Sequence, residues 1–264
     1  MLNNIPQVTK NILILNIMFF VATYILKTQG IDLISQFGAH YVNSTLFQPF
    51  QIVTHFFMHG NFFHIFFNMW LFVMLGAYLE KIWGPKRFFI FYIATALGAF
   101  GLYNVIGVYE LQLLKENIIT AGYDINEINY QLKIFNSEFI PNDQFTGRFN
   151  QFYTNLILSG VVENSDSSFN YLLNSYTPMV GASGAVFGIL AAFAILFPNT
   201  EFMIYFMFPI KAKFLVGGYF LFEIYQAYQD KVGDSTAHLA HVGGAIVGGI
   251  IVLIWRKTDK NNFW

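Results

Sequence analysis

The sequence contains no cysteine and little charge. None of its 264 residues is cysteine, and only 11% are Asp, Glu, Lys or Arg. The missing cysteine excludes disulfides, thiolate catalysis and thiolate metal sites. An average soluble domain carries about 25% charged residues, so we expect this chain in a membrane. The net charge of -1 gives no basic surplus, which excludes nucleic acid as an expected partner.

The chain is instead rich in apolar residues. Hydrophobic residues make up 55% of it, and phenylalanine alone occurs 32 times. Six apolar stretches predict an all-α membrane protein with six transmembrane helices embedded in the lipid bilayer. We expect these spans at about Asn11–Leu26, Asn61–Leu79, Phe88–Val108, Gly181–Phe197, Phe214–Tyr228 and Ala237–Trp255. No cleavage site follows the first stretch, so we expect it to be retained as a span.

A polar stretch separates the third and fourth spans. Residues 109–177 are rich in Asn, Ser, Gln and acidic residues, which predicts an acidic insertion exposed to water. Apolar residues recur at helical spacing around Leu114 and Leu132, so we expect amphipathic helices within it. We expect residues 1–264 to form a single membrane domain that contains this insertion. Segment Phe202–Pro209 is apolar but too short to cross, and we expect it in the membrane interface.

The positions of lysine and arginine predict an orientation. With the N-terminus in the cytoplasm, nine of the 14 basic residues fall on the cytoplasmic side, as the positive-inside rule requires. Six spans then place both termini in the cytoplasm and make the insertion extracytoplasmic. The beginnings of the second, fourth and sixth spans also lie toward the outer face. The small size and the lack of a transit peptide favour the bacterial cytoplasmic (inner) membrane.

The fourth span opens on a serine between two glycines, in Gly181-Ala182-Ser183-Gly184. A nucleophilic serine needs small neighbours, because a substrate carbonyl must come within bonding distance of its hydroxyl. The free N–H groups of a helix N-terminus can also stabilise the oxyanion that forms. The same residues equally fit small-residue packing between membrane helices, so this motif alone leaves two interpretations open.

Three further side chains fit the chemistry of a reacting serine. His241 lies about one turn into the sixth span, which begins on the same side as the span of Ser183. Histidine is the usual base near neutral pH, so His241 could take the serine proton. His64 and Asn68 share one face of the second span and could donate to an oxyanion. We see no acid near His241 on its own helix, which favours a dyad over a triad.

Small residues also predict close contact between the fourth and sixth spans. Each span contains a GxxxG sequence, Gly184 to Gly188 in one and Gly244 to Gly248 in the other. Glycines at this spacing let two helix backbones approach closely. Such packing would bring the hydroxyl and the imidazole together, so the structural and the catalytic interpretations support each other.

These motifs resemble, in order, those of the rhomboid family of intramembrane serine proteases. The matching stretches are Gly181-Ala182-Ser183-Gly184, His64-Ile65-Phe66-Phe67-Asn68 and Ala240-His241-Val242-Gly243-Gly244. The resemblance covers nearly the whole chain and implies a six-helix rhomboid-like bundle. It implies single-span membrane proteins as substrates, cut in or just outside the membrane, with neither a cofactor nor a metal.

The resemblance also implies roles for individual residues. Ser183 would be the nucleophile, His241 the general base, and His64, Asn68 and the Ser183 N–H the oxyanion hole. Phe187 falls where members often carry an aromatic residue that stacks on the catalytic imidazole. The glycines that support the site are Gly181, Gly184 and Gly244. The fifth helix and the loop before the sixth would gate access.

Two features depart from the family pattern. Many members carry a Trp-Arg pair in the first loop, where this chain has Phe50-Gln51, so the anchoring of that loop is in question. The family usually has a short connection between the third and fourth spans, where this chain has residues 109–177. Our hypothesis for this insertion is a substrate-docking or lid domain.

Two alternatives belong to other functional classes. A non-catalytic rhomboid-like scaffold that binds membrane-protein clients would be favoured by the loss of Ser183 or His241, and both are present. A small transporter predicts an internal repeat or charged residues in the middle of the bilayer, and we see neither.

Other polar residues have simpler interpretations. His238 and His241 have the spacing of a metal pair, but the chain lacks HExxH, and we expect His238 to be a polar residue at the helix mouth. We interpret His55 and His59 as hydrogen-bonding loop residues. Glu223 is an acid within the fifth span, which makes it either a functional candidate or an interfacial side chain that reaches water.

Overall fold

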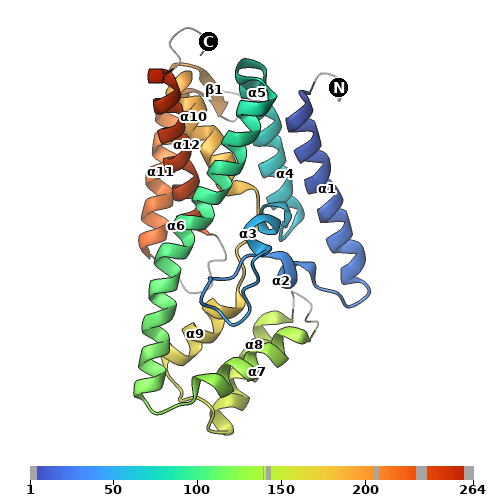
Figure 1. Cartoon of the computed structure of the whole chain (residues 1–264), viewed down its shortest axis with the longest axis vertical. Coiled ribbons are helices and arrows are strands. Elements are labelled where there is room, and N and C mark those ends of the chain that lie inside the picture. The colour runs from blue at the N-terminus through green and yellow to red at the C-terminus, as the bar shows by residue number, and fades with distance from the viewer. Residues whose placement is uncertain (1–4, 139, 141–143, 205–207, 230–236, 259–264) are drawn as a thin grey trace. The chain divides into compact units, whose positions relative to one another are not determined.

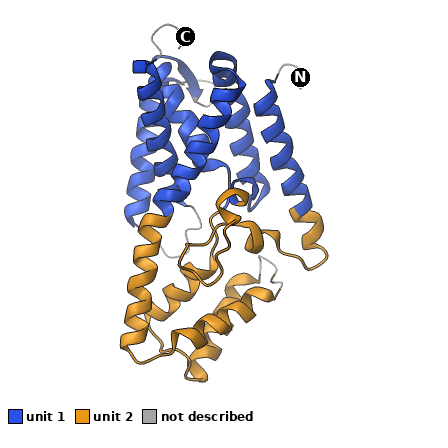
Figure 2. Ribbon diagram, in the orientation of Figure 1, with its two compact units in different colours: residues 1–22, 55–103, 180–264 blue, residues 23–54, 104–179 orange. Residues whose placement is uncertain are grey.

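The computed structural model describes residues 5–138, 140, 144–204, 208–229 and 237–258. Within these residues the chain is mostly helical and contains one two-stranded sheet (Figure 1). It divides into two compact units (Figure 2). Unit 1 comprises residues 1–22, 55–103 and 180–264, and unit 2 comprises residues 23–54 and 104–179.

Unit 1 contains most of the apolar helices. They are α1 (Gln7–Lys27), α4 (Phe62–Leu71), α5 (Ala77–Trp83), α6 (Pro85–Thr120), α10 (Ser183–Leu196), α11 (Ala212–Gln229) and α12 (His238–Thr258). A short 3-10 turn, η2 (His55–Phe57), precedes α4, and a π-helical turn, η3 (Phe72–Gly76), joins α4 to α5. The last residues of α1 and the second part of α6 belong to unit 2.

Four helices are long and apolar enough to cross a membrane, so the protein is an integral membrane protein. They are Gln7–Lys27, Phe62–Trp83, Pro85–Thr120 and His238–Thr258. The third extends well past the predicted end at Val108. Helix α10 is apolar but has only 14 residues, and α11 carries Lys213 and Glu223 in its 18 residues. The six-span count therefore remains a prediction for α10 and α11.

The all-α prediction misses a β-hairpin after α10. Strands β1 (Glu201–Ile204) and β2 (Phe208–Lys211) pair antiparallel, with Glu201 opposite Lys211. This is the apolar segment that we expected in the membrane interface. It is too short for a spanning helix, and strand pairing satisfies its backbone hydrogen-bonding groups instead.

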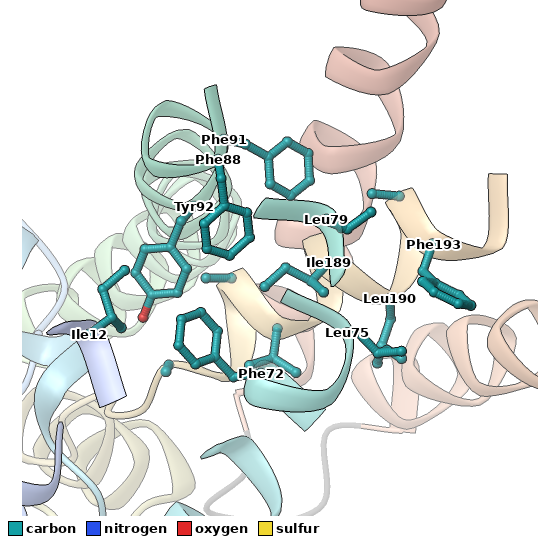
Figure 3. Packing of buried hydrophobic residues seen from close by; sticks show 14 of the residues in the cluster. Ile12, Phe72, Leu75, Leu79, Phe88, Phe91, Tyr92, Ile189, Leu190 and Phe193 are labelled. Atoms are coloured by element: carbon teal, nitrogen blue, oxygen red, sulfur yellow. The ribbon is translucent and has the colours of Figure 1, made fainter. Parts of the chain in front are cut away.

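The core of unit 1 is a cluster of aromatic and aliphatic side chains from α1, η3, α5, α6 and α10 (Figure 3). Phe72, Phe88 and Tyr92 are fully buried in it. The rings of Phe72 and Tyr92 meet edge to face, with centroids 5.3 Å apart. Dispersion and burial at these contacts hold the second span against α6 and α10.

A buried carboxylate caps α1. Glu80 of α5 is 3% exposed and accepts hydrogen bonds from the N–H groups of Val8 (2.9 Å) and Thr9 (2.7 Å). These N–H groups lie in the first turn of α1, where a helix lacks internal acceptors and favours negative charge. Glu80 therefore has a structural role.

Unit 2 has its own core, and the insertion supplies most of it. Its helices are α2 (Leu33–Phe37), α3 (Gln51–Thr54), the end of α6, α7 (Ile125–Ser137), α8 (Phe145–Leu158) and α9 (Asp166–Tyr176). Fully buried members of this core include Leu111, Leu132, Phe149 and Leu172. Asp124 caps α7 by accepting the N–H of Asn126 at 2.8 Å. Residues 109–177 therefore contribute packed amphipathic helices.

The first loop is anchored by the glutamine at the position where the sequence departs from the family pattern. The side chain of Gln51 is 1% exposed and accepts the N–H of Gln48 at 3.1 Å. Its amide donates to the carbonyl of Gln36, also at 3.1 Å. Gln51 thus ties together backbone segments of this loop within unit 2.

Helices α10 and α12 run side by side through four glycines, Gly184, Gly188, Gly244 and Gly248, which we call the α10–α12 glycine contact. A Cβ at Gly244 would lie 1.9 Å from the carbonyl oxygen of Gly184, and one at Gly248 would lie 2.7 Å from the Cα of Gly188. The two helices run parallel, because successive turns of one meet successive turns of the other. This contact confirms the close approach that the GxxxG spacing predicts.

We predict that Gly244→Ala destabilises the protein and that Gly249→Ala does not. The added methyl at position 244 must displace backbone, which typically costs about 1–3 kcal/mol. A Cβ at Gly249 would meet only Ile195 Cδ1, at 3.5 Å, and alanine favours a helix over glycine. Thermal unfolding in detergent measures both variants. A midpoint for Gly244→Ala at or above that of the wild type would contradict this account of the glycine contact.

Candidate active site

Ser183 and His241 form a hydrogen-bonded pair. Ser183 is the first residue of α10, and His241 lies in the first turn of α12. The Nε2 of His241 lies 2.8 Å from the Oγ of Ser183. His241 is 8% exposed, whereas Ser183 is partly exposed, so a substrate carbonyl has access to the hydroxyl. This is the geometry in which a base removes the proton of a nucleophile.

The imidazole of His241 is held in plane by Phe187. The two rings stack with centroids 4.2 Å apart and an interplanar angle of 7°. Phe187 lies one turn after Ser183 on α10, so one helix presents both the hydroxyl and the stacking ring. The stack leaves the ring edges, where the two nitrogens lie, free for hydrogen bonds.

A strained turn leads into α10. Gly181 has φ = +116°, a conformation that L side chains rarely adopt, and its N–H donates to the carbonyl of His55 at 2.9 Å. The first bond into the helix runs from the N–H of Val186 to the carbonyl of Ala182, at 3.0 Å. The N–H of Ser183 lies before that bond, in the first turn, where N–H groups lack helical acceptors and attract negative charge.

His64 and Asn68 lie beside this turn. Asn61 caps α4 by accepting the N–H of His64 at 2.9 Å, which sets the helix start. A Cβ at Gly181 would lie 2.7 Å from His64 Nε2 and 3.6 Å from Asn68 Nδ2. Asn68 is 7% exposed, and its Nδ2 has no hydrogen-bond partner among the described residues. Two side-chain donors therefore lie against the backbone that precedes Ser183.

Glu223 also belongs to this site, which the sequence analysis did not predict. Its Oε2 lies 2.9 Å from His241 Nδ1 and 2.6 Å from His238 Nδ1. Its side chain is 2% exposed, so the interfacial alternative for Glu223 is wrong. The search for an acid considered only the helix of His241. An ionisable residue in an apolar helix was the signal that could have extended the search to α11.

Glu223, His238 and His241 could also hold a metal ion, since one potential ligand atom from each lies within 4.8 Å of the others. In the structure these atoms are hydrogen-bonded to one another at 2.6 and 2.9 Å. Tetrahedral zinc, with Zn–N bonds of roughly 2.0–2.1 Å, separates its ligands by about 3.3 Å. The observed spacing fits a proton network better than a metal centre. His238 is therefore more than a polar residue at the helix mouth.

His59 does not behave as the expected hydrogen-bonding loop residue. It is 1% exposed, and neither ring nitrogen has a hydrogen-bond partner among the residues described. Its ring meets that of His64 edge to face, at 5.0 Å. Burial, reinforced by the neighbouring His64, lowers the pKa of His59 to about 3, and the nearby Phe57 carbonyl opposes this only slightly. His59 is therefore neutral and adds no charge beside His64.

Comparison with known proteins identifies one family. Its sequence model, described as the Rhomboid domain, matches residues 46–122 and 144–258. An uncharacterized mitochondrial rhomboid protein of Schizosaccharomyces pombe is 40% identical over 89 residues, which cover 31% of this chain and 22% of the relative. Rhomboid-like protease 1 of Toxoplasma gondii is 27% identical over 128 residues, which cover 46% of this chain and 43% of the relative. The chain thus spans less than half the length of either relative.

We predict that Gly181→Ala slows the reaction of Ser183 with a fluorophosphonate probe. The added Cβ would lie 2.7 Å from His64 Nε2 and must displace either that ring or the turn. A misplacement of about 1 Å at a reacting centre costs on the order of 10²-fold in rate. The labelling rate of purified protein measures the effect.

Gly84→Ala is the matched control for Gly181→Ala. Gly84 also has a positive φ, of +78°, but nothing lies within 4 Å of its Cβ position. It therefore reproduces the backbone strain without crowding the site. Equal labelling rates for the two variants would show that strain alone, rather than the position of His64, explains the loss.

Proposed function

The chain belongs to the rhomboid family, and we propose that it is an intramembrane serine protease. Its substrates would be single-span membrane proteins, cut within or close to their transmembrane segments. The observation that carries this proposal is the 2.8 Å contact between Ser183 Oγ and His241 Nε2. The named protease among the relatives, from Toxoplasma gondii, gives further support.

In the proposed reaction, His241 Nε2 takes the hydroxyl proton as Ser183 Oγ attacks the carbonyl carbon of the scissile peptide. The carbonyl oxygen becomes an oxyanion in a tetrahedral intermediate. His241 then gives the proton to the leaving amine, and the C–N bond breaks to leave an acyl-enzyme on Ser183. A water molecule, deprotonated by His241, hydrolyses that ester and restores the free hydroxyl.

We further propose that His64, Asn68 and the Ser183 N–H stabilise the oxyanion. Asn68 Nδ2 is buried without a partner among the described residues, so it is free to donate to an incoming oxygen. The N-terminal end of α10 adds a partial positive charge at the same place. Donors fixed in advance stabilise the charge as it develops without reorganising at that moment.

For the membrane topology we keep the predicted arrangement of six spans, with both termini in the cytoplasm and the active site open to the outer face. Within unit 1, α1 begins and α12 ends at the same end (Figure 1), which agrees with an even number of crossings. The bacterial inner membrane has no support from the relatives, since both come from eukaryotes and one is named as mitochondrial. The membrane that houses the protein is therefore left open.

We expect the wild-type protein to cleave a single-span test substrate in liposomes, and Ser183→Ala and His241→Ala to be inactive. Removing a nucleophile or its base typically lowers kcat on the order of 10⁴–10⁶-fold. Asn68→Ala should lose about 10²–10³-fold, the usual cost of one oxyanion donor. Gel-based cleavage rates measure all four proteins.

Labelling with a fluorophosphonate separates a wrong substrate from a wrong function. A wild-type protein that labels at Ser183 without cutting the substrate has the proposed chemistry and needs another substrate. A folded wild-type protein that neither labels nor cuts would favour the alternative, a non-catalytic scaffold that binds membrane-protein clients.

We also propose that the insertion, residues 109–177, serves substrate docking or acts as a lid. Its removal should then change the cleavage of protein substrates while Ser183 still labels. Labelling serves as the control for folding, because the probe reports the site itself. Unchanged cleavage of every protein substrate by a labelled deletion variant would remove this hypothesis.

A further inference from the structure

Glu223 is directed into the active site from a helix that otherwise faces outward. Among the 18 residues of α11, the buried ones are Ala212 and Glu223. Its large neighbours Leu221 and Tyr225 are 67% and 56% exposed. A carboxylate in an apolar helix is expensive to bury, and its cost is offset only where the group is paired. Its burial among apolar residues therefore calls for a specific contact.

That contact is with the proposed general base. The Oε2 of Glu223 lies 2.9 Å from His241 Nδ1, and the opposite ring nitrogen, Nε2, lies 2.8 Å from Ser183 Oγ. A carboxylate can only accept a hydrogen bond, so this contact puts a proton on Nδ1. Nε2 is then left with the lone pair that must receive the serine proton.

We propose that Glu223 is a positioning residue that completes a Ser183–His241–Glu223 triad. This inference rests on the proposed protease function and replaces the dyad that we expected from the sequence. During the reaction the serine proton moves to His241 Nε2, and the Nδ1 proton stays in place. Glu223 takes no proton. It holds the ring in the reactive tautomer and balances the charge of the imidazolium that forms.

His238 supplies the second hydrogen bond to the same oxygen. Its Nδ1 lies 2.6 Å from Glu223 Oε2, and the rings of His238 and His241 lie nearly perpendicular, with centroids 6.2 Å apart. Two ring N–H groups therefore converge on one oxygen and fix the carboxylate between them. This second contact orients Glu223, as Glu223 orients His241.

The titratable groups that face this network come from three helices. Besides His238 on α12, Tyr219 lies one turn before Glu223 on α11 and is 44% exposed. His64 on α4 lies near enough to His241 to repel its positive charge. Neither group adds a negative charge near neutral pH. Glu223 is thus the counter-charge for a protonated His241 among these groups.

The test compares Glu223→Gln, Glu223→Asp and the control Glu80→Gln in full-length protein in liposomes. Glutamine can donate to Nδ1 and so stabilise the unreactive tautomer, and we expect kcat/KM to fall about 10²–10⁴-fold. Aspartate keeps the charge on a shorter side chain and should restore part of the rate. Glu80→Gln alters another buried carboxylate of unit 1, the one that caps α1, and should leave kcat/KM within about threefold of the wild type.

The rate–pH profile gives a readout that a merely structural role would not move. The acid limb of kcat/KM reports the protonation of the free enzyme's base. Without the counter-charge, protonated His241 loses stabilisation, so the limb of Glu223→Gln should move to lower pH by about 1 unit or more. A lower rate with an unmoved limb, and no rescue by aspartate, would overturn the proposal.

The remaining outcomes separate this inference from the proposed function. If wild type cuts, Ser183→Ala and His241→Ala do not, and Glu223→Gln cuts like wild type, the triad is wrong and the protease stands. If wild type neither cuts nor labels, the protease itself fails. Wild-type activity that rises on addition of EDTA would show that the cluster holds an inhibitory metal instead, and it would overturn the triad.

Discussion

The site depends above all on the α10–α12 glycine contact. Ser183 lies one residue before the first glycine of this contact on α10, and His241 lies three residues before the first on α12. Any side chain placed between these backbones would push the helices apart, and the hydroxyl and the imidazole would separate with them. Because two successive turns are in contact, both the spacing and the rotation of the helices are fixed. The packing of small residues and the chemistry of the site are therefore one constraint.

Around this contact the structure keeps polar groups that satisfy no partner of their own. The amide of Asn68 and the ring of His59 are buried without hydrogen bonds among the described residues. An unsatisfied buried donor typically costs about 1–3 kcal/mol of stability. The cost at Asn68 is understandable if its partner is an oxygen that carries charge only in the transition state, because such a donor favours the reaction over substrate binding. For His59 the structure offers no comparable partner.

The parts of the site that lie on one helix were predictable, and those that depend on packing between helices were harder to predict. His64 and Asn68 share a face through their spacing, and the GxxxG sequences indicate close contact. Glu223 escaped because its link to His241 joins α11 to α12, and no local pattern reveals which residues of separate helices meet. The hairpin at Glu201–Lys211 escaped for a related reason, since a short apolar run predicts burial without choosing between strand and helix. Spans that were long and apolar were the easiest to find.

The position of Glu223 connects the proposed base to the least buried helix of the site. Most of α11 is exposed in unit 1, and its buried anchors are Ala212 near the β-hairpin and Glu223 at the active site. Resemblance to the rhomboid family implies that this helix gates substrate entry. If α11 moves outward, the hydrogen bond to His241 Nδ1 must lengthen before the helix can clear the site. Access and base orientation are then coupled, and the triad is complete only when α11 has returned. A protease arranged in this way has its base fully oriented only after the substrate has entered and the helix has closed behind it.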